Sequence, residues 1–234
     1  MFHLSHFNQH HLTIKADCEY TCLGCKHQSA QTKVTLPSTI KKGDIVNIYG
    51  GAIHNYDYLE SLLDDCYQHK LRVRLYSNHT ILNMDSLILK GVETVFIWCP
   101  TPIKSDFNFT VGEPLFDEFK ESLTGTELSR QISLVMLVRP LTIDVLPDFY
   151  DLCVDANTNG VVLYLPQEFN AEERRYIKRF KRVNNMRVIA QRKGQGNHCF
   201  SAPNGMDSFL YELNDWGFAM RQSFKRLPLI GRTL

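Results

Sequence analysis

The sequence reads Asp17-Cys18-Glu19-Tyr20-Thr21-Cys22-Leu23-Gly24-Cys25-Lys26-His27 directly after a short strand-like run at residues 11–16. Its three cysteines follow a C-x3-C-x2-C spacing. Cysteine thiolates bind soft metals, and four of them normally hold a four-iron cluster. Three clustered thiolates would bind three irons and leave the fourth iron open, as catalytic zinc sites leave one position open.

This spacing resembles the signature of the radical S-adenosylmethionine (radical SAM) enzymes. The resemblance implies that Cys18, Cys22 and Cys25 bind a 4Fe-4S cluster whose open iron is chelated by the amino and carboxyl groups of S-adenosylmethionine (SAM). In that family an electron, from a donor such as flavodoxin or ferredoxin, cleaves SAM to methionine and a 5′-deoxyadenosyl radical. The radical then abstracts hydrogen from a substrate.

A closed zinc site is the main alternative, because His27 could join the three cysteines as a fourth, tetrahedral ligand. The chain would then be a zinc-stabilised binding module without catalysis. The sequence has no second C-x2-C pair of the kind that structural zinc sites usually use. An odd number of cysteines, seven, also disfavours a disulfide framework.

Composition favours one cytoplasmic α/β protein. The chain has 234 residues, is 44% hydrophobic and carries a formal charge of +1, which disfavours a nucleic-acid partner. No apolar run is long enough for a membrane span, and the first residues lack the pattern of a secretion signal. We expect four scattered cysteines to be buried free thiols in a reducing compartment: Cys66, Cys99, Cys153 and Cys199.

Strand-like and helix-like segments alternate along the chain. The strand-like runs are 11–16, 45–49, 71–76, 92–98, 132–138, 160–165 and 186–190, and the helical patterns are 56–67, 84–89, 114–123, 145–156, 171–182 and 206–216. This alternation predicts parallel strands with right-handed crossovers, and six such units make a partial (β/α)6 TIM-like barrel. We expect residues 1–200 to form this core and 201–234 to form a helical tail packed on or near it.

Functional loops of such a barrel follow the carboxyl ends of its strands. Gly50, Gly51 and Ala52 follow the second strand, where the radical SAM family carries a Gly-Gly-Glu motif that binds the SAM amino group. Ala52 replaces the acid, so backbone carbonyls, or a polar group such as His54 or Asn55, would have to replace it. A plain turn between strand and helix is the alternative interpretation.

Asn78 and Arg139 follow the third and fifth strands. Asn78 lies where the family often has Thr-Asn-Gly, which implies a position near SAM, and Arg139 could pair with the SAM carboxylate. A turn asparagine and a surface arginine are the alternatives. Thr101 is the polar candidate after the fourth strand, and Gln167 is a further candidate after the sixth.

The substrate implied by the resemblance is a small molecule or a peptide that enters the open barrel mouth. Gly24 stands where many family members place an aromatic residue, which Tyr20 or His27 could replace. A glycine at this position resembles the activases of glycyl-radical enzymes. Activation of a partner enzyme is therefore the second function within the family.

Overall fold

Seven parallel strands form one open sheet. The computed structural model describes residues 8–14, 16–18, 33–50, 52–89, 91–138, 140–165, 169–184 and 187–190. The strands follow one another across the sheet in chain order, and every neighbouring pair is parallel. They are β1 Gln9–Thr13, β2 Ile45–Tyr49, β3 Arg72–Ser77, β4 Thr94–Trp98, β5 Ile132–Leu137, β6 Gly160–Leu165 and β7 Arg187–Ala190.

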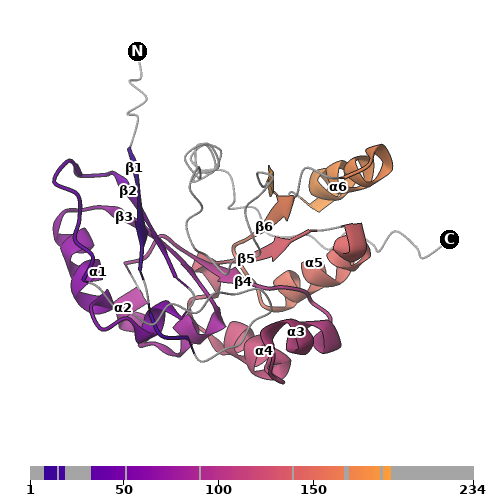
Figure 1. Ribbon diagram of the computed structural model, residues 1–234, viewed down its shortest axis with the longest axis horizontal. Coiled ribbons are helices and arrows are strands. Elements are labelled where there is room, and N and C mark those ends of the chain that lie inside the picture. The colour runs from indigo at the N-terminus through magenta and orange to yellow at the C-terminus, as the bar shows by residue number, and fades with distance from the viewer. Residues whose placement is uncertain are drawn as a thin grey trace, which may run out of the picture.

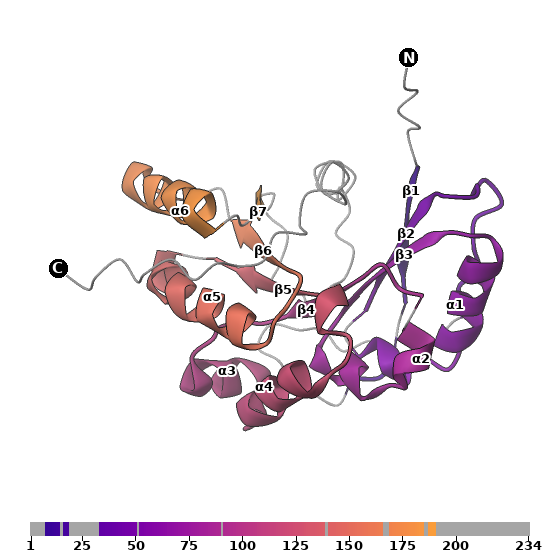
Figure 2. The ribbon, with the colours of Figure 1, turned by 180° about the vertical axis from the view of Figure 1, so that it is seen from behind.

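The helices lie on the outer side of this curved sheet (Figures 1 and 2). The α-helices are α1 Leu59–Gln68, α2 Ser86–Leu89, α3 Lys104–Val111, α4 Phe116–Gly125, α5 Leu146–Asp155 and α6 Ala171–Asn184. Short 3-10 turns are η1 Ile53–Asn55, η2 His79–Asn83, η3 Ser129–Gln131 and η4 Pro140–Val145. Chain-order parallel strands with helices outside form a partial TIM-like barrel, which confirms the predicted fold class.

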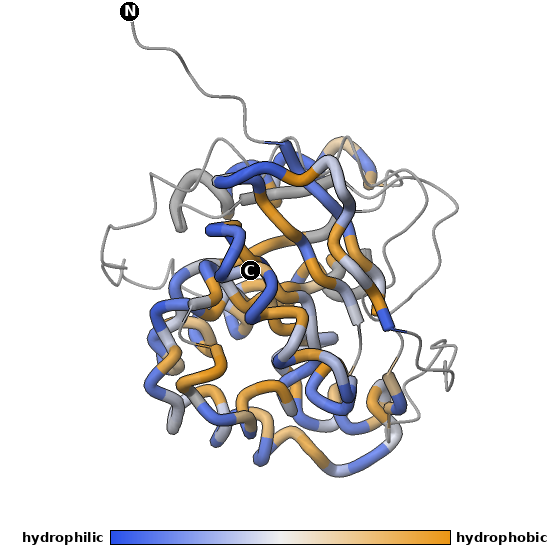
Figure 3. Tube along the Cα trace, turned by 90° about the vertical axis from the view of Figure 1, so that its left-hand side faces the viewer, coloured by the Kyte–Doolittle hydropathy of each residue, from blue (hydrophilic) through white to orange (hydrophobic). Residues whose placement is uncertain are grey.

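Side chains alternate between the two faces of each strand, so the sheet has an outer face and an inner face. The outer face packs on the helices and is apolar, with Val46 and Ile48 of β2 in one buried cluster with Leu59 and Leu63 of α1. Figure 3 shows hydrophobic and hydrophilic residues interspersed along the strands and helices. The inner face carries the alternate residues, including Gln9, His11, Asn47, Tyr49, Arg74, Tyr76 and Phe96.

Most predicted elements lie within three residues of their observed bounds, but one helix was missed. The sequence shows no helical pattern between residues 98 and 114, and the structure has α3 there. Phe107 and Val111 bury one side of α3, and Gly112 ends it in the left-handed conformation at φ 89°. The predicted helix at 206–216 and the 201–234 tail lie outside the described residues.

Asp44 fastens the amino-terminal end of β1 to β2. Its buried carboxylate accepts hydrogen bonds from His10 Nε2 at 3.0 Å, from the backbone N–H of Asn8 at 3.1 Å and from that of Lys41 at 2.9 Å. Burial alone would raise the pKa of Asp44, but these bonds and the nearby His10 charge outweigh it, so the pKa lies below its ordinary value of 3.8.

We expect Asp44→Asn to lower the free energy of unfolding by about 2 kcal/mol at pH 7, because charge-assisted hydrogen bonds are lost. The folded-state pKa is depressed, so this stabilisation is complete above pH 3.8 and is lost as the pH falls through the lower folded value. Urea unfolding from pH 7 to pH 2 measures both effects. Asp64→Asn on the exposed side of α1 is the control, and equal unfolding free energies for the two variants at pH 7 would contradict the assignment.

Candidate functional site

The carboxyl ends of the strands meet at one edge because all strand pairs are parallel. Cys18 follows β1, Gly50 and Ala52 follow β2, and Asn78 follows β3, so the structure brings four predicted site residues to this edge. The pairing of neighbouring strands continues one residue beyond the carboxyl ends of β1 and β2. Ile14 N–H donates to the Tyr49 carbonyl, and Gly50 N–H donates to the Tyr76 carbonyl.

Several predicted site residues lie outside the described residues. These are Cys22, Cys25, Gly51, Arg139, Gln167, Tyr20 and His27. Their roles stay predictions. Within the part of the chain that the structure describes, no three His, Cys, Asp or Glu side chains come close enough to hold a metal ion.

Cys18 lies in the loop that leaves β1. Its side chain is half-buried and packs against the apolar cluster under the sheet. The carbonyl of the preceding residue, Asp17, accepts a hydrogen bond of 2.9 Å from Asn55 Nδ2 in η1. This bond holds the start of the cysteine loop against the turn that follows β2. The amide group of Asn55, a candidate for binding the SAM amino group, therefore already bonds the neighbouring loop.

Gly50 is required by packing. A Cβ at this position would clash with the Cγ2 methyl of Ile53 and lie 3.1 Å from Cγ1 of Ile14. Ala52 is fully buried two residues later. An acid in place of Ala52 would have a buried carboxylate, which is costly without partners. The close packing of Gly50 gives a structural reason for the glycine, and its predicted role in binding SAM stays a prediction.

A chain of hydrogen bonds joins the turn after β2 to the loop after β3. Thr80 donates its hydroxyl hydrogen to Asn78 Oδ1 at 2.5 Å, and its oxygen lies 2.8 Å from His54 Nδ1. Because the hydroxyl has one hydrogen, His54 must donate through Nδ1. The chain fixes the Asn78 amide with its oxygen toward Thr80. The Asn78 Nδ2 hydrogens face the other way and can donate to a ligand.

The loop after β4 offers less to a ligand. Thr101 is buried, and its Oγ1 accepts a hydrogen bond from the backbone N–H of Ile103 at 3.2 Å. The Cys99 thiol donates to the Thr101 carbonyl at 3.4 Å. Thr101 therefore shapes the turn into α3, and its role as the candidate site residue after the fourth strand stays a prediction.

Three of the four cysteines expected to be buried free thiols are confirmed as such. Cys66, Cys99 and Cys153 are buried and free, whereas Cys199 lies outside the described residues. Burial, with the adjacent Asp65 charge, raises the pKa of Cys66 to about 12. Burial also raises the pKa of Cys99 and of Cys153. These thiols stay protonated and unreactive at neutral pH.

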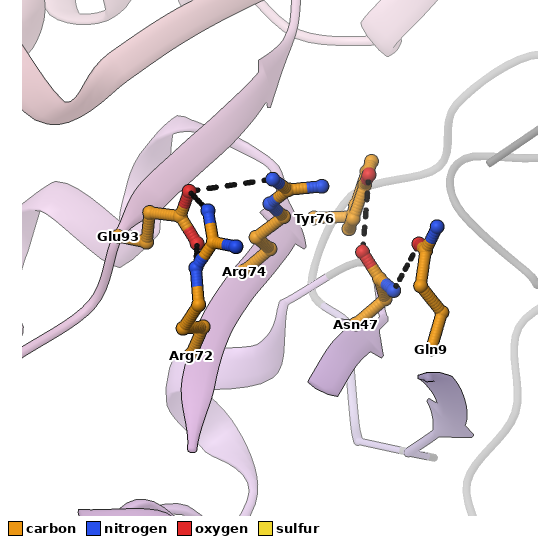
Figure 4. A network of polar contacts seen from close by, with 6 residues as sticks. All are labelled: Gln9, Asn47, Arg72, Arg74, Tyr76 and Glu93. Atoms are coloured by element: carbon orange, nitrogen blue, oxygen red, sulfur yellow. Dashed lines mark hydrogen bonds and ion pairs between the residues drawn. The ribbon is translucent and has the colours of Figure 1, made fainter. Parts of the chain in front are cut away.

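The inner face carries a buried row of aromatic rings. Tyr49 stacks on Tyr76 and Tyr76 stacks on Phe96, each at 4.4 Å between ring centroids. His11 Nδ1 lies 3.1 Å from the Tyr49 hydroxyl. Figure 4 shows the polar neighbours of this row, in which Asn47 bonds Gln9 at 3.2 Å and Tyr76 at 3.5 Å.

Sequence reasoning gave no role to this polar inner face, although a signal was present. Strands of a parallel sheet are buried on both faces and normally read as continuous apolar runs. Asn47 in β2 and Arg74 in β3 interrupt those runs and point to the inner face. A buried amide and a buried guanidinium opposite one another indicate a polar site inside the barrel.

Comparisons with known proteins show the fold. No family model matches the sequence, and no curated protein matches it. Solved structures of SuiB from Streptococcus suis do match. The one bound to precursor peptide SuiA has a TM-score of 0.58 at 10% identity and covers 80% of this chain and 49% of SuiB. The one bound to S-adenosylmethionine has a TM-score of 0.52 at 12% identity and covers 79% and 47%.

The chain therefore shares an open parallel β/α fold with a protein that was crystallised with SAM and with a peptide. It spans about half the length of SuiB. None of the described helices is both long and apolar enough to cross a membrane.

Iodoacetamide should modify Cys18 of the metal-free chain at pH 8 at least about a hundredfold faster than Cys66, Cys99 or Cys153, because buried thiols with raised pKa values hold few thiolates. Peptide mass spectrometry after timed labelling gives the rates. Labelling in urea is the control and should equalise the cysteines. Fast labelling of Cys99 in the folded chain would contradict its buried position.

Proposed function

We propose that this protein is a radical SAM enzyme. One observation carries the proposal: the C-x3-C-x2-C motif starts in the loop after β1, at the edge where the carboxyl ends of all the parallel strands meet. That edge is where β/α barrels place their active sites. The fold shared with a structure bound to S-adenosylmethionine supports the proposal.

Cys18, Cys22 and Cys25 would bind the 4Fe-4S cluster, and their donor set fits, because thiolates are the usual ligands of such clusters. When bound, the reduced cluster supplies the electron that cleaves SAM. The described position of Cys18 is consistent with this assignment, since its side chain is only half-buried and its loop is held by Asn55.

The remaining residues of the edge would position SAM. The backbone at Gly50 and Gly51, with Ala52 in place of the family's acid, would face the SAM amino group. Asn78 would donate from Nδ2, because its oxygen is held by Thr80. Arg139 would pair with the SAM carboxylate.

The substrate would be a small molecule or a peptide, and the electron would come from a donor such as flavodoxin or ferredoxin in the cytoplasm. The peptide class is supported by SuiB, which was crystallised with its precursor peptide. Gly24 favours a second function, activation of a glycyl-radical enzyme, in which the substrate is the backbone of a partner protein.

Anaerobically reconstituted wild-type protein should be brown and should cleave SAM reductively to 5′-deoxyadenosine, whereas Cys22→Ala should lose at least about 99% of this activity, because the cluster then lacks a ligand. Liquid chromatography of the products measures the cleavage. Cys66→Ala, which removes a buried thiol of α1, is the control and should retain activity. A colourless protein with stoichiometric zinc would support the zinc-stabilised module instead.

Thr80→Val should weaken SAM binding about fivefold, because it breaks the hydrogen-bond chain that orients Asn78 and the chain contributes about 1 kcal/mol. Equilibrium binding of SAM to the cluster-loaded protein measures the change. Thr124→Val is the matched control, since the Thr124 hydroxyl bonds only carbonyls of its own helix, α4. Equal affinities for the two variants would remove Asn78 from the proposed SAM site.

A further inference from the structure

Arg74 is a buried cation with unused hydrogen-bond donors. Its side chain is 4% exposed, and it projects from the middle of β3 onto the inner face between Asn47 of β2 and Thr94 of β4. Its Nη2 lies 3.3 Å from Glu93 Oε1. Its Nε and Nη1 are fully buried and have no hydrogen-bond partner in the part of the chain that the structure describes. Buried guanidinium groups are normally paired, because an unpaired buried charge is costly.

Arg74 shares the carboxylate of Glu93 with a second arginine. Arg72 donates from Nη2 to Glu93 Oε1 at 2.6 Å and from Nε to Oε2 at 3.0 Å (Figure 4). Two guanidinium groups thus share one carboxylate, and Arg74 contacts it only through Nη2. Asp44, the buried acid at the start of β2, is engaged by His10 and two backbone N–H groups.

Beyond Arg72 and Glu93, the described neighbours of Arg74 on the inner face include the uncharged polar side chains of Asn47 and Tyr76. The Asn47 amide is held by Gln9 and Tyr76, so its orientation is fixed. Tyr76, two residues after Arg74 on the same face, is the middle ring of the stacked aromatic row between Tyr49 and Phe96. The barrel interior therefore offers a cationic hydrogen-bond donor next to flat aromatic surfaces.

From these contacts we infer that Arg74 binds a carboxylate of the substrate inside the barrel. A guanidinium hydrogen-bonds carboxylate oxygens strongly through its N–H groups, and Nε and Nη1 of Arg74 have N–H groups to spare. A carboxylate is favoured over a phosphate dianion, because it brings one negative charge and not two into a buried place. The inference that this carboxylate belongs to a substrate rests on the proposed function. It narrows the substrate class to carboxylates.

The test measures binding of acetate and of inorganic phosphate to the full chain, without cluster or SAM, by thermal denaturation at constant ionic strength. We expect a saturable rise in Tm with acetate and a smaller rise with phosphate. Arg74→Gln should weaken acetate binding about 10- to 100-fold, because hydrogen bonds to a charged group are lost. The exposed Arg130→Gln is the matched control and should leave acetate binding unchanged.

Two further readouts separate binding from a purely structural role. Glu93→Gln removes the competing carboxylate and should strengthen acetate binding about tenfold, even if Arg74→Gln fails to fold. Arg74→Gln should melt, without acetate, no lower than wild type, because it removes a buried charge that is only partly compensated by Glu93. A lower Tm together with an unchanged acetate response, an absence of acetate binding, or tighter binding of phosphate than of acetate would overturn the inference.

These outcomes are independent of the proposed function. A chain that cleaves SAM but does not bind acetate through Arg74 would overturn only the carboxylate site. A chain that binds acetate through Arg74 but does not cleave SAM would overturn only the proposed radical chemistry.

Discussion

The parallel pairing of the strands is the constraint on which the rest of the structure depends. Parallel pairing places the carboxyl ends of all the strands at one edge of the sheet. The crossover connections place the helices on the outer face of the sheet. Cys18, Gly50 and Asn78 come from three different strand ends that are far apart in sequence, and the pairing alone brings them to one edge. Hydrogen bonds then fix the loops to one another, through Asn55 to the Asp17 carbonyl and through Thr80 to His54.

The two faces of the sheet differ in polarity. The outer face is apolar because it buries the helices, and its side chains need only fill space. The inner face contains Asn47 and Arg74, and a buried polar group needs a partner for each donor. Asn47 finds partners in Gln9 and Tyr76, whereas Arg74 keeps donors to spare, so the inner face is arranged for a ligand as well as for stability.

The fold could be predicted from the sequence because its signal is repeated. The runs at 45–49 and 160–165 match β2 and β6 residue for residue, and α5 lies within one residue of its predicted bounds. The helix α3 was missed because its apolar side is narrow and its amino-terminal end follows a segment rich in proline. The chain Asn78–Thr80–His54 could not be predicted, because it depends on how two loops meet in space. The interactions of Cys22, Cys25 and Arg139 lie beyond the described residues and stay predictions.

The hydrogen bonds that hold β1 at both of its ends also affect the tendency of the protein to self-associate. β1 is an edge strand of the described sheet, and edge strands of open sheets can pair with strands from other chains. Asp44 holds one end of β1, and Asn55 holds the loop that leaves its other end. A slip by one residue would break both attachments and turn Leu12 out of the apolar core. The barrel can therefore stay open on this side while strand exchange and sheet-to-sheet aggregation are disfavoured.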